Sequence, residues 1–294
     1  MKRVELAAVT LLLSTVWSGA ASPPVIAFAR DSDIWVADFD GSHPRKITKG
    51  SGPTISPDGT QIVFNTDGAQ RRIALVEVAT KKVKIFHEEI PSDNCFGAIW
   101  SPDGHQILFN IWTDDKWHLG LIHADGSAFR YVRKSTGTTD SLWSTCFAPD
   151  GNSIYGQDLD KIYQFSLDGK ERARWEIKSL FPNGGCNSNS RFAISPDGKR
   201  LLMEVDMDEE EVSQPGWDGP PSALWTLEFA SRKVTRLTPK GLLAWEGCWL
   251  DDARILYVSQ TAKEKQPVLS EMKLTEKNRK SILKNATTPT VSRP

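Results

Sequence analysis

Two segments bring tryptophans and carboxylates close together in the sequence. The first is residues 110–117, and the second, residues 206–221, is longer than the segments at equivalent positions. Aromatic side chains beside charged groups are typical of binding surfaces, and loops longer than a fold requires are often functional. The residues that we expect to contact a ligand or partner are Trp112, Asp114, Asp115, Trp117, Trp217 and Asp218. The alternative is that Trp112 and Trp117 flank strand ends as packing residues, as we expect for Trp35, Trp100, Trp143 and Trp249.

The second segment begins with a run of acidic residues. Oxygen ligands of this kind suit calcium, and the carboxylates that would hold the ion are Asp206, Asp208, Glu209 and Glu210. The run lacks the spacing of a known calcium loop. A solvated acidic loop is therefore the favoured interpretation, and we expect no cofactor and no metal.

The histidines show no pattern of a catalytic or metal site. We expect His118 and His123 to lie on one strand, where their odd separation places them on opposite faces. None forms a pair with metal-ligand spacing. We interpret all five as surface residues and predict that the protein is not an enzyme; they are His43, His87, His105, His118 and His123.

Four cysteines leave two interpretations open. They are Cys95, Cys146, Cys186 and Cys248. An even number in an exported chain permits two disulfides, with three ways of pairing them. Free, buried thiols are the alternative. Since no two cysteines are spaced as C-x-x-C, the sequence does not indicate a thiolate zinc site or a redox motif.

The N-terminus has the pattern of a secretory signal peptide, which we assign to residues 1–21. Lys2 and Arg3 precede an apolar run at residues 6–16, and small residues follow. That run is shorter than the roughly 20 residues of a membrane-spanning helix, and no later segment is apolar for long enough. We therefore expect a periplasmic or secreted protein, a monomer without a transmembrane segment. The 37 acidic and 36 basic residues argue against a nucleic-acid partner.

A tetrapeptide repeat determines the expected fold. Ser-Pro-Asp-Gly at residues 56–59 occurs again at 101–104 and 195–198, as Ala-Pro-Asp-Gly at 148–151, and in degraded form at 250–253. Successive prolines are 45, 47 and 47 residues apart. Because the motif occurs once per repeat, we interpret it as a structural turn and not as catalytic. The turn residues are Asp58, Gly59, Asp103, Gly104, Asp150, Gly151, Asp197 and Gly198.

Strand patterns around the turns predict a propeller. An apolar segment runs into each turn and an alternating, β-rich segment follows, as at residues 61–64. Two more strands follow in each repeat, for example at residues 73–76 and 83–86. Four short strands every 45 or so residues, with no helical periodicity, are typical of a propeller blade.

The chain ends predict how the ring closes. Residues 25–48 contain only three strands, and their innermost strand is missing. Residues 289–292, Pro-Thr-Val-Ser, nearly repeat Pro-Thr-Ile-Ser at residues 53–56. We therefore expect an all-β protein, a six-bladed propeller of four-stranded antiparallel blades over residues 22–294. Its C-terminal strand completes the first blade.

The repeat resembles the blades of TolB-type propellers. The turn of that family carries the same Ser-Pro-Asp-Gly, and its outer strand often ends in Leu-Thr, which occurs here as Ile47-Thr48 and Leu237-Thr238. The resemblance extends over nearly all of the mature chain and implies the fold more than the function, since propellers carry unrelated activities. TolB has an α/β domain ahead of its propeller, whereas here we expect strands directly after the signal peptide.

Two other families with similar blades are enzymes. Prolyl oligopeptidases carry their catalytic residues in a separate domain, and this sequence has no Gly-x-Ser-x-Gly nucleophile turn. Oligogalacturonate lyases are longer, have seven blades and use clustered histidines. The leading hypothesis is therefore a non-catalytic scaffold that binds a protein or peptide partner on its loop face. The alternative is a glycan-binding or glycan-cleaving propeller that uses the tryptophans and carboxylates of the two segments.

Overall fold

A tight turn at each repeat motif joins the two inner strands of a blade. In the computed structural model, which describes residues 24–137, 141–207 and 220–293, the Gly59 amide donates to the Ser56 carbonyl at 2.9 Å. The Ser56 hydroxyl donates to Asp58 Oδ1, which also accepts the Thr60 amide. Gly59 has a φ of 75°, in the left-handed region that glycine adopts without steric cost. The motif therefore closes the turn with its own side chain and backbone.

The other three copies have the same geometry. Gly104, Gly151 and Gly198 have φ values of 73°, 70° and 73°. Each amide donates to the carbonyl three residues earlier, at distances between 2.8 and 3.0 Å. The aspartate of each turn accepts the amide two residues later, as Asp103, Asp150 and Asp197 show.

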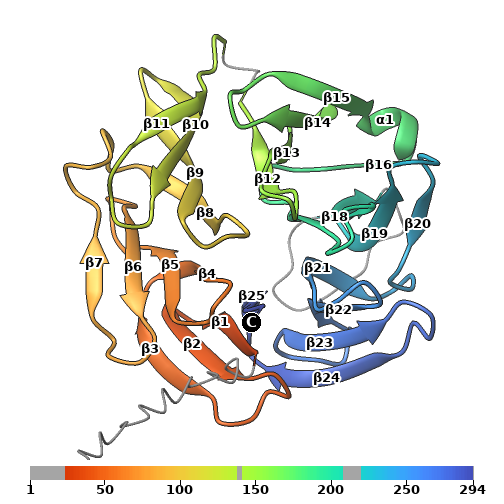
Figure 1. Cartoon of the computed structure of the whole chain (residues 1–294). Helices are drawn as coiled ribbons and strands as arrows, with labels where there is room; N and C mark the ends of the chain where they lie inside the picture. Colours follow the sequence, from red (N-terminus) through yellow and green to blue (C-terminus); the bar gives the residue numbers. More distant parts are fainter. Residues whose placement is uncertain (1–23, 138–140, 208–219, 294) are drawn as a thin grey trace, which may run out of the picture.

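Six antiparallel sheets surround a central axis like the blades of a wheel (Figure 1). From the hub outward, the first blade contains β25 (Thr287–Val291), β1 (Val25–Arg30), β2 (Asp33–Asp38) and β3 (Arg45–Lys49). The second contains β4 (Ser51–Ile55), β5 (Gln61–Asn65), β6 (Ile73–Glu77) and β7 (Val83–Ile85). The third contains β8 (Cys95–Trp100), β9 (Gln106–Thr113), β10 (Lys116–His123) and β11 (Arg130–Arg133).

The remaining three blades complete the wheel. The fourth contains β12 (Trp143–Phe147), β13 (Ser153–Gln157), β14 (Lys161–Ser166) and β15 (Glu171–Glu176), followed by the short helix α1 (Ile177–Leu180). The fifth contains β17 (Phe192–Ile194), β18 (Arg200–Met207), β19 (Ser222–Glu228) and β20 (Val234–Arg236). The sixth contains β21 (Leu243–Trp249), β22 (Arg254–Gln260), β23 (Val268–Lys273) and β24 (Arg279–Lys284).

The fifth blade departs from the predicted four strands. A two-residue strand, β16 (Gly184–Gly185), pairs with Asp206 and Met207 of β18. Strand β18 extends beyond β17, so its last residues offer free backbone groups to which β16 can bond. The fold prediction is otherwise confirmed.

The C-terminal strand closes the ring as the sequence predicts. Strand β25 pairs antiparallel with β1, placing Val291 opposite Ile26 and Thr290 opposite Ala27. The Thr290 hydroxyl oxygen also accepts the Ile55 amide of the second blade at 3.1 Å. One strand therefore completes its own blade and ties it to the next.

The hydrophobic core consists of six clusters, and each lies between two neighbouring blades. Consecutive residues of β5 show the reason. Ile62 and Phe64 pack toward the first blade and Val63 packs toward the third, since successive side chains of a strand point to opposite faces. Each sheet is therefore buried on both sides, and no blade has a core of its own.

The predicted signal peptide, residues 1–21, lies outside the described residues. Among residues 24–137, 141–207 and 220–293, no helix has the length and apolar character needed to cross a bilayer.

Deletion of residues 287–294 should strongly destabilise the protein. Loss of β25 exposes the edge of β1 and part of the core between the first and sixth blades. One kcal/mol shifts the melting temperature of a domain of this size by about 2–4 °C, and we expect a decrease of at least about 10 °C by calorimetry. A synthetic peptide of residues 285–294 should restore part of the loss and a scrambled peptide should not. An unchanged melting temperature would contradict this closure.

Candidate functional site

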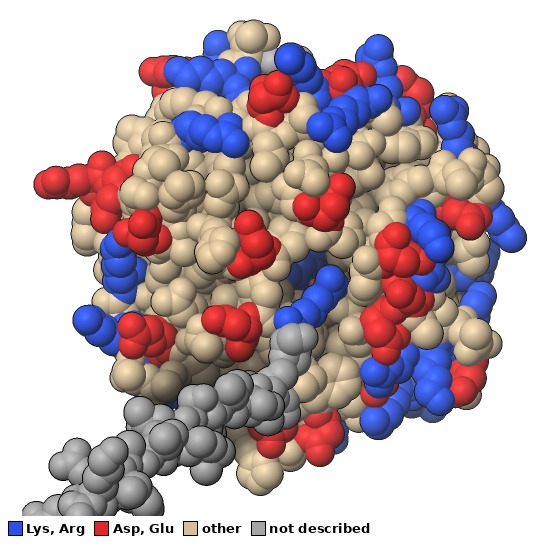
Figure 2. Space-filling model, in the orientation of Figure 1, with Lys and Arg blue, Asp and Glu red and all other residues tan. Residues whose placement is uncertain are grey.

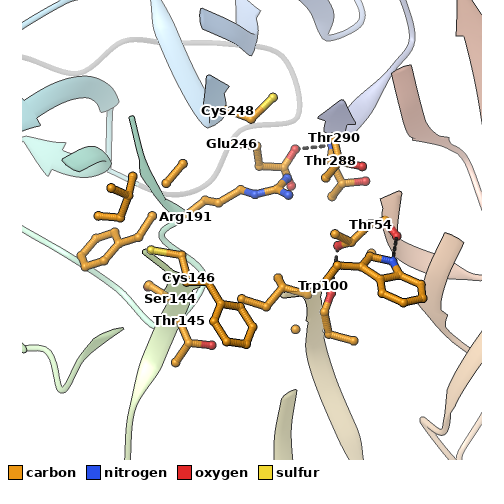
Figure 3. Close-up of a pocket in the computed structure, with 18 of the residues that line it drawn as sticks. Thr54, Trp100, Ser144, Thr145, Cys146, Arg191, Glu246, Cys248, Thr288 and Thr290 are labelled. Atoms are coloured by element: carbon orange, nitrogen blue, oxygen red, sulfur yellow. Dashed lines mark hydrogen bonds between the residues drawn. The ribbon is translucent and has the colours of Figure 1, made fainter. Parts of the chain in front are cut away.

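A cavity of about 550 Å³ runs along the hub and is lined by the inner strands of all six blades (Figure 3). Its volume is within the range of pockets that hold small ligands or peptide segments. On the face shown in Figure 2, acidic side chains surround the central opening and basic side chains lie within it. The arginines that line the cavity are Arg191 and Arg293.

Six equivalent positions form a ring around this cavity. In the second to fifth blades, each position lies five residues before the proline of the turn motif. In the first and sixth blades, it lies five residues before the residue that replaces this proline. From the first blade to the sixth, the ring residues are Thr288, Gly52, Gly97, Ser144, Arg191 and Glu246. All six line the cavity. The second and third blades therefore contribute no side chain, whereas the other four contribute hydroxyl or charged groups.

Backbone strain marks three of the ring positions. The inner strands of five blades carry a β-bulge here, with a shift in register against the next strand. Gly52 and Gly97 adopt φ values of 59° and 66°, and Ser144, Glu246 and Thr288 adopt 56°, 52° and 48°. This left-handed conformation suits glycine but costs another residue about 1–3 kcal/mol. Non-glycine residues in such conformations cluster at functional sites.

Hydrogen bonds join each charged ring residue to the C-terminal strand of the first blade. Figure 3 shows Arg191 reaching from beside β17 toward Glu246 and Thr288. Arg191 Nη1 donates to the Pro289 carbonyl at 3.1 Å, and the Thr288 amide donates to Glu246 Oε2 at 2.5 Å. Burial raises the pKa of Glu246, and the Thr288 hydrogen bond opposes that effect. The fifth, sixth and first blades thus hold a fixed pair of opposite charges in the channel.

A buried carboxyl group supports Glu246 from behind. The Glu246 amide donates to Glu204 Oε2 at 3.1 Å. In the second, third and fourth blades the equivalent residues are Asn65, Asn110 and Gln157, whose side-chain amides donate to a carbonyl of the next blade. Glu204 is only 6% exposed, and this burial raises its pKa to about 8. Burial therefore favours the protonated form of Glu204.

An aromatic cluster lies near the start of the inner strands of the third and fourth blades. Trp117 packs edge-on against Phe96, Trp112 and Trp143, with ring centroids 4.9, 5.2 and 6.1 Å away. Phe96 stacks on Trp143 at 5.7 Å, and the Arg71 guanidinium lies 5.8 Å from the Trp117 ring. Since Phe96 also lines the cavity, the cluster is continuous with the channel.

Residues 110–117 form a tight hairpin and not an extended loop. Trp112 and Trp117 are directly opposite each other on β9 and β10. Asp114 and Asp115 make the two-residue turn, with φ values of 52° and 57°, and both are exposed. Positive φ at both turn residues is the geometry of a type I′ hairpin. The two tryptophans are partly exposed and the two carboxylates project beyond them.

The second predicted segment lies mostly outside the described residues. Trp217, Asp218 and the three acidic residues 208–210 (Asp208, Glu209 and Glu210) cannot be placed with the hairpin. Asp206 is described and accepts a hydrogen bond from Asn187 Nδ2 at 2.7 Å. Among the described residues no group of three or more histidine, cysteine, aspartate and glutamate side chains is arranged to hold a metal. The solvated acidic loop stays the prediction, and calcium binding stays the alternative.

His118 is buried, not a surface residue as the sequence suggested. It is 4% exposed, and its Nδ1 accepts the Ser135 amide at 2.9 Å. Its Nε2 lies 3.2 Å from the Thr113 carbonyl. The odd spacing from His123 placed the two residues on opposite faces of β10 correctly, but both faces of a blade are covered by neighbours. Sequence spacing alone did not show this.

All four cysteines are free thiols, so the structure contains neither disulfide; Cys95 and Cys146 are buried, and Cys186 and Cys248 are partly exposed. Each belongs to a different blade: Cys95 to β8, Cys146 to β12, Cys248 to β21, and Cys186 to the segment between β16 and β17. Burial raises the pKa of both Cys95 and Cys146 to about 12. Such thiols form little thiolate and react poorly.

The sequence reasoning missed Arg191, Glu246 and Thr288. They are far apart in the chain and match no short motif. The signal that would have found them is their common distance from the turn, because that distance places them at the same height in the hub. The sequence analysis likewise identified Trp112 and Trp117 but not Phe96, which the blade arrangement brings to them.

Replacement of Thr288 by glycine should not destabilise the protein, because the left-handed backbone favours glycine and Thr288 Oγ1 makes no hydrogen bond to the described residues. Thr290→Gly is the matched control, since Thr290 is 5% exposed and accepts the Ile55 amide. The control should lower the free energy of unfolding by about 1–3 kcal/mol in urea titrations. Equal losses in the two variants would show that the ring position is unstrained.

Glu204→Gln should reduce the dependence of stability on pH. The pKa of Glu204 is about 8 in the folded protein, against an ordinary value of 4.5. The folded chain therefore binds more protons between these values, and stability falls as pH rises through that window by up to about 1.4 kcal/mol per pH unit. Urea titrations should show a flatter profile for Glu204→Gln, whereas exposed Glu88→Gln should follow the wild type. Parallel profiles for all three proteins would contradict the assignment.

Comparison with known proteins supports the fold. No protein-family model matches the chain. A TolB homologue of Chlorobaculum tepidum is 27% identical over 114 residues, which are 36% of this chain and 25% of that protein. The matched region is thus about a quarter of the length of this curated relative.

Solved structures extend the likeness to most of the chain. TolB from Acinetobacter baumannii superposes with a TM-score of 0.67 at 16% identity, covering 93% of this chain and 67% of that one. A chain of a nidogen/laminin complex gives 0.66 at 11% identity, covering 92% and 98%. Puromycin hydrolase gives 0.52 at 16% identity, covering 90% of this chain and 44% of the hydrolase. The chain therefore has a TolB-type six-bladed propeller fold.

Proposed function

We propose that this protein is an exported, monomeric, non-catalytic scaffold that binds a protein or peptide partner. The partner would contact the face on which the second-to-third-strand hairpins and the blade connections emerge, which we call the loop face. The observation that carries the proposal is the continuity of the aromatic cluster with the hub cavity at this face. A rigid group of aromatic residues beside an arginine is typical of the centre of a protein interface.

The order of the strands supports the loop face as the proposed binding surface. Trp112 and Trp117 flank a second-to-third-strand hairpin, and Phe96 and Trp143 lie in the first two residues of inner strands, which follow blade connections. In an antiparallel four-stranded blade these two kinds of connection are at the same end. Asp114 and Asp115 stand at the rim of the cluster, where charged groups improve specificity more than affinity.

The cavity chemistry supports binding over catalysis. Ser144 and Cys146 line the cavity and would be candidate nucleophiles. The Ser144 hydroxyl accepts a hydrogen bond from the Gln157 side-chain amide at 3.1 Å, and an amide is not a base that could activate it. The pKa of about 12 at Cys146 opposes thiolate formation.

The packing of the aromatic side chains favours a protein partner over a glycan. A sugar-binding tryptophan presents an open indole face, whereas the Trp117 ring contacts three other aromatic rings and lies near the Arg71 guanidinium. Trp112 and Trp143 are only partly exposed. The nidogen/laminin structure provides an example of a similar fold in a complex between proteins.

A photo-cross-linking amino acid at Asp115 should capture a discrete partner in the envelope or secreted fraction of the source organism. Lys170 is the control position, since its side chain is 83% exposed and lies in a third-to-fourth-strand turn at the opposite end of a blade. Trp117→Ala should lower the cross-linked yield about tenfold, the effect expected of an aromatic residue at an interface centre. Trp175→Ala, a partly buried tryptophan of an outer strand, should leave it unchanged.

Capture of the same species from Lys170, or an equal yield from the Trp117 and Trp175 variants, would rule out the loop face. The glycan alternative would be supported instead if the wild type bound a sugar on a glycan array and the Trp117→Ala variant did not.

A further inference from the structure

We propose that the hub channel contains a carboxylate-binding site in which Arg191 is the binding residue, and that it recognises a carboxylate of a peptide segment. The proposal rests on the proposed function in that the peptide belongs to the partner. It goes further by naming the chemical group that enters the channel.

Arg191 has hydrogen-bonding capacity directed into the cavity. A guanidinium carries five N–H donors in a planar fork. The side chain of Arg191 makes one hydrogen bond to the described residues, from Nη1 to the Pro289 carbonyl. The guanidinium lies within the channel (Figure 3), with Nε and Nη2 free of described partners. A planar group with two adjacent donors suits the two oxygens of a carboxylate.

The channel provides space on the side away from Arg191. A Cβ atom added to Gly52 or Gly97 would meet no atom closer than 3.9 Å. The second and third blades therefore leave the ring open, while the fourth, fifth, sixth and first fill it with polar side chains. A peptide can pass along the open side and present one acidic group to the arginine.

The charges around the site favour an anion. Arg191 and Arg293 both line the cavity, and both act on Cys248, where their charges lower the thiol pKa against the larger effect of burial. Glu246 is the carboxylate of the ring, and burial of Glu204 behind it raises the pKa of that group and favours its neutral form. Among the described residues that line the cavity as a whole, two are cations and one is an anion.

Glu246 serves as a positioning residue for Arg191. Its charge and that of Arg191 attract each other, and it is itself held by the Thr288 amide. The left-handed backbone at Glu246 is strained. The second and third blades have glycine at this position and avoid the strain, so filling space does not by itself explain a glutamate here. Fixing the guanidinium in advance reduces the entropy lost when a ligand binds.

The test is a titration of the full-length, isotope-labelled protein, followed by the NMR signal of the Arg191 Nε–H group. The probes are N-acetyl-trialanine with a free carboxylate, the same peptide as its C-terminal amide, and N-acetyl-Ala-Asp-Ala-amide. We expect saturable binding of a carboxylate probe and none of the neutral amide. The first and third probes distinguish a chain-end carboxylate from a side-chain carboxylate.

Arg191→Gln should weaken carboxylate binding at least tenfold, and Arg191→Lys should give an intermediate loss because it keeps the charge but not the fork. For the variants, binding is followed by the indole signals of the tryptophans that line the cavity. Arg232→Gln, an exposed arginine of the β19–β20 turn, is the matched control and should bind as the wild type does. Melting temperatures of all variants confirm that each is folded.

Three results would overturn the proposal. The first is equal affinity for the acid and amide peptides, and the second is unchanged carboxylate binding in a folded Arg191→Gln variant. The third uses trialanine amide, a probe with a free amine: it is preferential binding of this probe to the wild type that is lost in Glu246→Gln. The probes are short and need no partner. A failed titration is therefore a separate result from failed cross-linking at Asp115.

Discussion

The antiparallel pairing of β25 with β1 is the interaction on which the rest of the structure depends. Every sheet is apolar on both faces, as Ile62 and Val63 of one strand show by packing toward different blades. Such sheets are stable only when each has a neighbour on either side, and an open row of blades would expose two apolar faces. By completing the first blade, β25 removes those exposed faces and brings the six inner strands around one cavity.

In the closed propeller, the residues of the turn motifs differ in role from the six ring residues that line the cavity. The turn motif forms its own hydrogen bonds within four or five residues, so it determines the shape of each blade end without help from the hub. The ring positions lie outside these turns, and two blades use glycine there. Where serine, glutamate and threonine occupy the left-handed position, they retain a strained backbone that glycine would relieve. Because glycine serves at the equivalent positions of two blades, the proposed binding role accounts for this strain better than packing does.

The repeat allowed most of the fold to be predicted, because a motif that occurs at a constant interval reveals both the blade and the number of blades. The short strand β16 was not predictable, since it depends on how far β18 extends beyond β17. The site was predicted only in part. Trp112 and Trp117 are neighbours in the sequence and were found, whereas Phe96 and Trp143 join them only through the blade arrangement. Arg191 and Glu246 are 55 residues apart in the sequence and meet only in the closed ring.

The most direct test of this account replaces the six ring residues one at a time with asparagine, which tolerates both left-handed and extended backbone, and measures partner capture and melting temperature for each variant. The account predicts that asparagine at Arg191 or Glu246 lowers capture about tenfold while the melting temperature stays near that of the wild type. A loss of capture that follows the loss of melting temperature across all six variants would contradict it, because the ring would then serve the fold and not the partner.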